Sequence, residues 1–432
     1  MNRNIIHIAF PAIIANITIP LLGFIDTSIA GHLGNTVYIG AIAVGAMMFN
    51  LIYWNFGFLR MGTSGLTAQA FGANDLNEAA RLLLRSSALA LLISLTILIL
   101  QYPLQWIALE LIGPSPNVTK WAQSYFFVCV WNAPAILIMM AIKGWFLGMQ
   151  DSTRPMFISI GVNIANIIVS LLAVFVFKMG FIGVAVGTVT ASYIGLAFAI
   201  ILIYRYHSDI IKLINWREAL HIRDLKRFFS INSDIFFRSL CLMLVTLFFT
   251  ARGARSGDVI LAANTIIMQL FIMFSYFMDG FAFAGEALVG KYTGSADNDA
   301  RSRCIRLLFI WGIGIAALFT ISYAAGLKPI FYLLTNDQTV INAALDYYWW
   351  CIAIPFAGMA AFVWDGVYIG LTATRQMLVS IFIASLSFMA VYYLQPGEAD
   401  NNRLWLAFIT YLAMRGISQT FLYRYVINVS SI

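Results

Sequence analysis

Charged residues are scarce in this chain of 432 residues: Lys, Arg, Asp and Glu together make up 10%, against about 25% in ordinary soluble domains. Hydrophobic residues make up 61%. A soluble protein of this length needs a larger charged surface, whereas a surface that faces lipid is itself apolar. The composition therefore excludes an ordinary soluble enzyme, a disordered chain and a secreted disulfide scaffold, and it predicts insertion into a membrane.

Paired cysteines and cofactor motifs are also lacking. The four cysteines lie far apart and form no CxxC pair, which is typical of buried packing residues. The four histidines are dispersed, and the sequence has no nucleotide-binding, zinc-protease or serine-hydrolase motif. We therefore expect no metal, no cofactor, no catalytic residues and no enzyme activity. Without a nucleotide site, any active transport must draw on an ion gradient.

Long apolar runs are abundant. A membrane helix needs about 20 apolar residues, and the continuous runs favour helices over the alternating strands of an outer-membrane barrel. The sequence predicts an all-α polytopic membrane protein with twelve transmembrane helices, near 5–30, 37–70, 80–102, 121–148, 156–177, 181–204, 229–251, 259–290, 304–326, 340–370, 377–395 and 404–427.

The Lys and Arg residues of the connections predict the orientation. With the N-terminus in the cytoplasm, sixteen of them fall on the inner side and six on the outer side, the six being Lys120, Lys178, Arg252, Arg255, Lys328 and Arg403. Both termini are therefore expected in the cytoplasm. The net charge of +7 then reflects topology and contact with anionic lipid, and no nucleic-acid partner is expected.

The two halves of the chain resemble each other at a spacing near 222 residues. Gly144-x-x-x-Gly148 matches Gly366-x-x-x-Gly370, and 72–75 match 294–297. We predict an N-lobe over 1–205, a cytoplasmic connecting loop over 206–228 and a C-lobe over 229–432, each lobe a six-helix bundle. Two pseudo-symmetric bundles that rock around a central site are typical of transporters.

Asp26 is the first candidate for ion coupling, because a charge at bilayer depth is costly and marks function. Pro20, six residues earlier, is expected to act as a hinge. A carboxyl group away from water exchanges protons nearer to neutral pH than an exposed one. Alternatively, Asp26 caps a bend or lies near the outer interface. Polar residues of the fifth span are expected either to hydrogen-bond Asp26 or to hold helices together; they are Asn163, Asn166 and Ser170.

Other charged residues inside predicted spans are candidates for lining a substrate cavity: Arg60, Lys143, Asp279, Glu286 and Asp365. Lys143 and Asp365 stand at matching places in the two halves, where they either face a shared cavity or form a permanent ion pair. Asp234 and Arg238 are four residues apart on one span, so a structural ion pair is expected between them.

Several stretches together resemble multidrug and toxic compound extrusion (MATE) transporters. They are 26–34, 66–73 and 144–150, and the segments 278–287 and 365–370 resemble the DinF branch in particular. The resemblance spans almost the whole chain. It implies twelve helices in two lobes, a central cleft, and export of drugs or toxins against inward flow of protons or sodium. The acid of the first helix in that family falls on Asp26, whereas Ser170 stands where many relatives carry a second acid.

The resemblance implies an antiporter in the bacterial inner membrane, expected to be a monomer, that exports cationic or amphipathic organic compounds by alternating access. Protons are favoured over sodium, because the N-lobe site has one carboxylate with Asn and Ser beside it. A flippase for lipid-linked precursors of the same superfamily is the alternative, although it would need a more cationic cavity. A membrane-embedded enzyme would need a nucleophile or metal-ligand constellation, and none was found.

Overall fold

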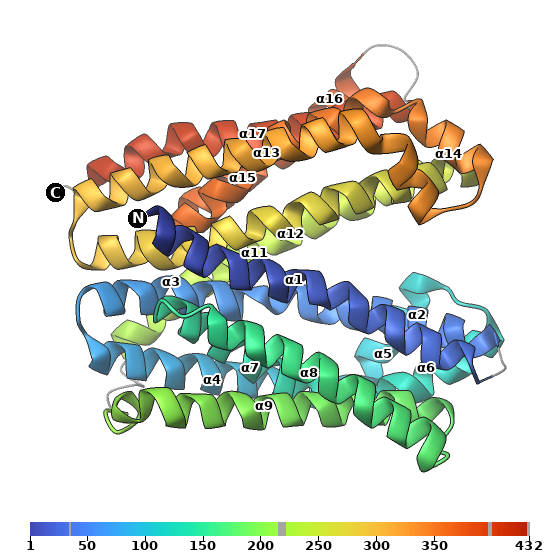
Figure 1. The fold of residues 1–432 in the computed structure, drawn as a ribbon, viewed down its shortest axis with the longest axis horizontal. Coiled ribbons are helices and arrows are strands. Elements are labelled where there is room, and N and C mark those ends of the chain that lie inside the picture. The colour runs from blue at the N-terminus through green and yellow to red at the C-terminus, as the bar shows by residue number, and fades with distance from the viewer. Residues whose placement is uncertain (34–35, 215–221, 396–399, 430–432) are drawn as a thin grey trace. The chain divides into compact units, whose positions relative to one another are not determined.

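The computed structural model describes residues 1–33, 36–214, 222–395 and 400–429, and within these ranges the regular structure is entirely helical (Figure 1). Ten helical passages of the described residues are long and apolar enough to cross a membrane. Two further long helices, α1 (Asn2–Gly31) and α17 (Asn401–Val429), bring the passages to the twelve expected. The chain is an all-α polytopic membrane protein, as its sequence predicts.

The helices form two compact units. The N-unit comprises Pro11–Asn232, and the C-unit comprises Ser233–Ile432 together with Met1–Phe10. Helix α9 continues to Ile211 and α11 begins at Ile222, so both helices extend into the range 206–228 that was expected to be a loop. Helical hydrogen bonding continues past the end of an apolar run, which is why hydropathy misplaced these ends.

The described residues of the N-unit include the greater part of α1, the start of α11 and the helices that lie between them in the chain (Figure 1). They are α2 (Thr36–Tyr53), α3 (Phe58–Gly72), α4 (Leu76–Ile99), α5 (Gln101–Ile112), α6 (Pro116–Cys129), α7 (Ala133–Gly148), α8 (Thr153–Leu171) and α9 (Phe181–Ile211). Within this unit α3 and α4 both pack on α7, and α8 packs on α9.

Two membrane passages of the N-unit are interrupted. The short 3₁₀ segments η1 (Trp54–Gly57) and η2 (Val130–Asn132) join α2 to α3 and α6 to α7, within the spans predicted at 37–70 and 121–148. A π-helical turn, η3 (Leu172–Val176), follows α8. Such breaks are common at hinges and functional sites, and hydropathy alone does not reveal them.

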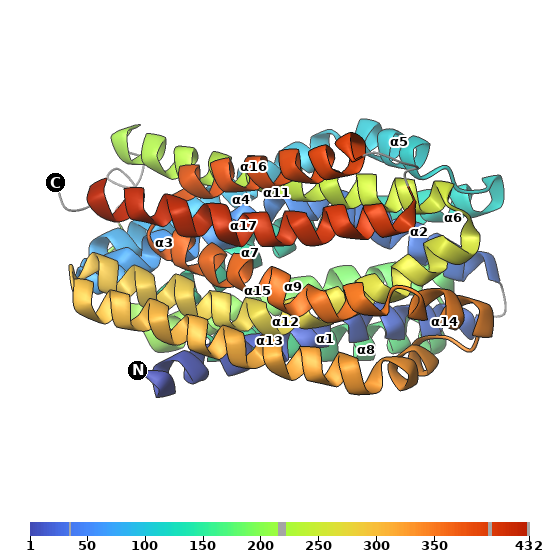
Figure 2. The same ribbon diagram turned by 90° about the horizontal axis from the view of Figure 1, so that it is seen from above.

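The C-unit contains longer, mostly unbroken helices. They are α11 (Ile222–Arg255), whose first residues belong to the N-unit, α12 (Asp258–Gly294), α13 (Asn298–Leu334), α14 (Gln338–Leu345), α15 (Tyr348–Gly370), α16 (Thr374–Leu394) and α17. Here α15 packs on α12, α13 and α17, and α16 and α17 lie side by side in both views (Figures 1 and 2). The short helix α5 was not predicted, because it is not long enough to span a bilayer. The span predicted at 340–370 is divided in the structure into the short helix α14 and the passage α15.

The same backbone contacts recur in both units at a spacing of 222 residues. A side chain on Gly144 would overlap the backbone oxygen of Arg60, and one on Gly366 would overlap that of Ala282. Only glycine lets two helix backbones approach so closely. In each unit this contact joins the fourth passage to the second, so the sequence repeat reflects a repeated helix packing.

The turns between the second and third passages repeat as well. Asn74 and Ala296 both have left-handed backbones, with φ of 57° and 56°. Each is followed by an N-cap aspartate: Asp75 accepts from the backbone N–H of the third residue on, at 2.9 Å, and so does Asp297. The repeat therefore extends to local features that hydropathy does not register.

Candidate functional site

Asp26 lies on α1 within the N-unit and is 6% exposed. Its Oδ1 atom is buried and accepts no hydrogen bond from any described residue. Tyr125 and Cys129, one turn apart on α6, lie close enough to interact electrostatically with this carboxyl group. A buried carboxylate oxygen without a partner is costly, so the group is suited to accept a proton or a cation.

Two polar side chains of α8 are fully buried in the same unit. Asn166 donates to the Thr188 hydroxyl of α9 at 3.0 Å, while its own Oδ1 has no partner among the described residues. The hydroxyl of Ser170 is likewise buried without a partner in the described chain, and it lies against Gly187, where a side chain on α9 would overlap it. The Asn166 amide thus holds α8 to α9 and leaves an oxygen free.

Asn163 connects α8 to the first helix. Its amide donates to the backbone oxygen of Thr18 at 3.1 Å, two residues before Pro20, which lies inside α1. A proline within a helix removes one backbone hydrogen bond and is a common cause of kinks. A side chain of α8 therefore holds α1 beside the residue expected to act as a hinge. Asp26 follows in the next two turns.

Lys143 lies on α7, half-buried, and donates to the Ser159 hydroxyl of α8 at 2.9 Å. Ser159 in turn donates to the backbone oxygen of Pro155 at 3.0 Å. No carboxylate of the described chain lies within ion-pair distance of the Lys143 ammonium group, whose contact is this neutral hydroxyl. Arg60, also half-buried, lies on α3, and its backbone is the surface on which Gly144 packs.

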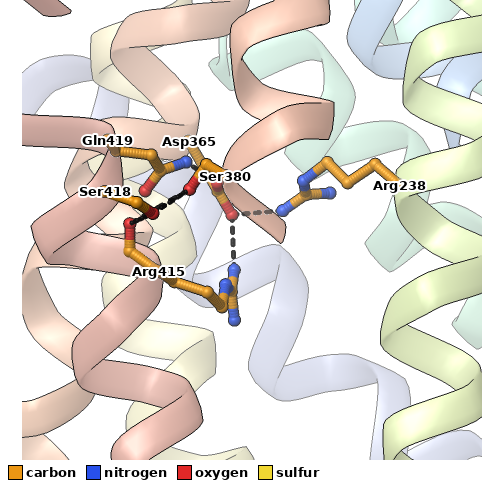
Figure 3. A network of polar contacts seen from close by, with 6 residues as sticks. All are labelled: Arg238, Asp365, Ser380, Arg415, Ser418 and Gln419. Atoms are coloured by element: carbon orange, nitrogen blue, oxygen red, sulfur yellow. Dashed lines mark hydrogen bonds and ion pairs between the residues drawn. The ribbon is translucent and has the colours of Figure 1, made fainter. Parts of the chain in front are cut away.

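In the C-unit, Asp365 is the centre of a buried polar network (Figure 3). Arg238 of α11 and Arg415 of α17 both pair with its Oδ2 atom, Arg415 at 2.7 Å. The Gln419 amide donates to Oδ1 at 2.8 Å. All four residues are less than 9% exposed. One carboxylate thus balances two guanidinium groups, and three helices converge on it.

The same network extends along α16 and α17. Ser380 donates to the backbone oxygen of Arg415 at 3.2 Å and shares a 2.7 Å hydrogen bond with Ser418 (Figure 3). The Arg415 guanidinium also lies 5.8 Å from the ring centre of Phe362 and 5.6 Å from that of Tyr411. The ion pair with Asp365 and the two aromatic rings hold the guanidinium group of Arg415, and the hydrogen bond from Ser380 holds the backbone of the same residue.

The expected pair of Asp234 with Arg238 is replaced by two other contacts. Arg238 pairs with Asp365, and Asp234 accepts a hydrogen bond from the Thr374 hydroxyl at 2.8 Å. The physical reason is that a long arginine side chain is stabilised more by a buried carboxylate on a facing helix than by a neighbour one turn away. Spacing on one helix allows a pair but does not select it.

Asp279 and Glu286 both lie on α12, seven residues apart. Asp279 is half-buried and Glu286 is 1% exposed. Asp279 also interacts electrostatically with Arg415. Lining of a substrate cavity by these residues, by Asp365, by Arg60 or by Lys143 remains a prediction.

Some residues beside the predicted sites were missed by sequence reasoning. Gln419 lies one helical turn after Arg415 on the last span, a spacing that places both on one helix face and marks the network now seen. Neither residue type nor spacing marks Tyr125 and Cys129 as neighbours of Asp26, because an aromatic residue or a cysteine in an apolar span is usually a packing residue.

Known proteins resemble this chain over nearly its full length. It is 34% identical to DNA damage-inducible protein F of Escherichia coli, over 97% of this chain and 91% of that protein. It is 23% identical to the probable multidrug resistance protein NorM of Photorhabdus laumondii, over 89% of this chain and 84% of the relative. The crystal structure of the Vibrio cholerae MATE transporter VcmN in its bent form superposes with a TM-score of 0.86 at 15% identity, covering 99% and 97% of the two chains.

The MatE family model matches residues 11–172 and 235–394, one segment in each unit. The two matched segments follow the structural repeat: each begins within the first passage of a unit and ends in the fifth. The chain belongs to the MatE family of membrane transporters and is similar along its length to DNA damage-inducible protein F.

Proposed function

We propose that this transporter is a proton-coupled antiporter that exports small organic compounds by alternating access, with Asp26 as the residue that carries the coupling proton. The observation that carries the proposal is the environment of Asp26: a buried carboxyl group on a proline-containing helix, with one oxygen unpaired within the described residues. Family relatives named for multidrug resistance support the export of drugs.

Protonation of Asp26 changes the charge of the N-unit interior. While ionised, the carboxylate favours an open, hydrated surrounding, because burying an unpaired charge is expensive. Once protonated, it no longer opposes closure of the helices around it. Bending of α1 at Pro20 is the movement that we expect to follow, with the Asn163 contact to Thr18 holding the segment before the hinge.

The nature of the surrounding side chains favours a proton over sodium. A hard cation needs several oxygen ligands arranged around it, whereas Asp26 has a thiol and a phenol as neighbours on α6. A proton needs only the carboxyl oxygen itself. Asn166 and Ser170 would then adjust the polarity of the site without forming a complete coordination shell.

The substrates that this proposal envisages are small, cationic or amphipathic organic compounds. An acidic site that alternates between charged and neutral forms binds a cation in one state and releases it in the other. The protein is proposed to reside in the bacterial inner membrane as a monomer with both termini in the cytoplasm, following the excess of Lys and Arg on one side.

A susceptibility panel tests the proposal. An efflux-deficient bacterium would express the wild-type chain, Asp26→Asn or Asp75→Asn, and growth would be measured against a series of cationic and neutral drugs. Asp75 is the matched control, because it lies in a turn and asparagine also caps helices well. We expect protection by the wild type and by Asp75→Asn, and none by Asp26→Asn at equal membrane levels. Full protection by Asp26→Asn would contradict the proposal.

A further inference from the structure

A pocket lies beside α5, a helix of the N-unit that hydropathy did not predict. The pocket has a volume of about 310 Å³ and is formed by α5, the turn after it and the start of α6. The turn is possible because the residue after α5, Gly113, has a left-handed φ of 63°. Asp26 is not among the residues that line the pocket.

The pocket wall carries two amide side chains and a hydroxyl beside its apolar residues. Gln105 is 8% exposed and Gln123 is half-buried, and neither side chain makes a hydrogen bond within the described chain. The Thr119 hydroxyl donates to the backbone oxygen of Ser115 at 3.0 Å, which leaves its lone pairs available. These amide groups can therefore donate to or accept from a ligand in the pocket.

Glu110 gives the pocket its charge. Its carboxylate is exposed at the pocket and forms no ion pair with any described residue, and no basic side chain is among the described residues that line the wall. Lys120 of α6 follows Thr119 in sequence but does not line the pocket. The pocket therefore has a net negative potential and suits a cation.

An aromatic ring lies next to this carboxylate. Trp106 precedes Glu110 by one helical turn, so both project from the same face of α5, and its side chain is 65% exposed. The face of an indole attracts ammonium groups, and a carboxylate beside it adds a charge contact. Leu109 adds apolar surface. This combination recognises an ammonium group that is attached to an apolar body.

The exposed side chains of α5 indicate that the pocket lies at the membrane–water interface. Tyr102, Trp106 and Leu111 are 68%, 65% and 74% exposed, although α5 is too short to span a bilayer. Large apolar and aromatic side chains on a short helix between two membrane passages are typical of the membrane–water interface. A ligand at this depth would be amphipathic.

We infer that this pocket is a second binding site, separate from Asp26, for the ammonium group of an amphipathic organic cation at the membrane interface. Its volume is at the lower end of the range for small-molecule pockets, about 300–1,000 Å³, so it holds a compact head group and not a bulky drug. An ethanolamine lipid head group and a free organic cation share this chemistry. Binding here is independent of the coupling proposed for Asp26.

Equilibrium binding of phenyltrimethylammonium to the purified full chain tests the inference. A maltoside detergent is suitable because it carries no ammonium group, and tert-butylbenzene is the neutral analogue of the probe. We expect the cation to bind and the neutral analogue not to compete. Glu110→Gln should raise Kd about fivefold, Trp106→Leu about threefold, and Lys120→Gln should lower Kd about twofold because a repelling charge is removed.

Asp26→Asn is the control that separates this site from the coupling site. Because Asp26 is itself proposed to bind cations, this variant removes that contribution, and the pocket should still bind phenyltrimethylammonium. Adding Glu110→Gln in the Asp26→Asn background should again raise Kd about fivefold. Competition by phosphatidylethanolamine, but not by phosphatidylglycerol, would identify the lipid as the occupant, and absence of competition would identify a free cation. No binding of the probe, an unchanged Kd in Glu110→Gln, or loss of binding in Asp26→Asn would overturn the inference.

Discussion

The N-unit and the C-unit share a backbone design and differ in the charges that it carries. Gly144 and Gly366 make equivalent close contacts, 222 residues apart. The residue before each glycine differs in charge: Lys143 has a neutral serine as its partner, whereas Asp365 is paired with two arginines. Helix packing was thus retained after the duplication while the polar interior diverged.

This difference separates two roles. The Asp365 carboxylate of the C-unit is fully paired, since it accepts from two guanidinium groups and an amide, although the Oε1 atom of Gln419 has no partner in the described chain. The N-unit keeps Asp26, Asn166 and Ser170 with buried oxygens that have no partner in the described chain. A carboxylate that is paired with two cations fixes helices, whereas an unpaired carboxylate is available to an ion or a ligand. We therefore propose that Asp26 of the N-unit serves coupling and Asp365 of the C-unit serves stability.

The largest effect is expected from Asp365→Asn. This change removes the carboxylate with which both Arg238 and Arg415 form ion pairs, and breaking one side of a buried ion network costs about 3–5 kcal/mol. Thermal unfolding in detergent would measure the loss. Asp234→Asn is the matched control, because the Asp234 carboxylate is held by a neutral hydroxyl. Equal losses in the two variants would contradict a special role for the network.

Substitution of either repeated glycine is expected to lower the free energy of unfolding by less than Asp365→Asn does, and by similar amounts at the two positions. Gly144→Ala and Gly366→Ala each force a methyl group against a backbone oxygen of the facing helix, and such overpacking costs about 1–3 kcal/mol. Gly314→Ala is the control, since no heavy atom lies within 4 Å of its added methyl group. A lower unfolding temperature in only one of the two variants would show that the helix packing around Gly144 and Gly366 is not equivalent.

Next in size are the helix caps of the two repeated turns. Asp75→Ala and Asp297→Ala each remove a side-chain hydrogen bond to a backbone N–H at the start of a helix, which costs about 1 kcal/mol. Substitution by asparagine should restore most of the stability at both sites. Chemical denaturation of the four variants tests this, and failure of asparagine to rescue would argue against capping.

The smallest effect on stability is expected from Lys143→Met. Its ammonium group donates to the Ser159 hydroxyl, so the change removes one hydrogen bond and about 1 kcal/mol or less. Comparison with Asp365→Asn in the same unfolding assay sharpens the contrast between the units. A loss as large as that of Asp365→Asn would mean that Lys143 is part of a charged network of its own.

Much of this architecture could be predicted from the sequence. Twelve apolar runs predict the twelve passages because burial in lipid depends on composition over about 20 residues, and repeated glycines reveal the duplication because close helix contacts tolerate no side chain. The breaks at η1 and η2 and the short α5 could not be predicted, since they change hydrogen bonding or length without changing hydropathy.

The polar sites were predicted less completely. Asp26, Asp365 and Lys143 were identified because ionisable residues inside apolar spans are rare and costly. Their partners depend on which helices face one another, and this information is absent from spacing along one helix. Arg238 shows the limit: its neighbour Asp234 was the expected partner, but a carboxylate 127 positions later is the observed one.

Coupling of transport to protons through Asp26 can be measured in proteoliposomes with a single imposed gradient. Wild type, Asp26→Asn and Asp75→Asn would be compared for uptake of a fluorescent organic cation under a pH gradient alone or a sodium gradient alone. We expect the pH gradient to drive transport in the wild type and in Asp75→Asn but not in Asp26→Asn, and the sodium gradient to drive none. Proton-driven transport at the wild-type rate in Asp26→Asn, or transport driven by sodium alone, would contradict the account.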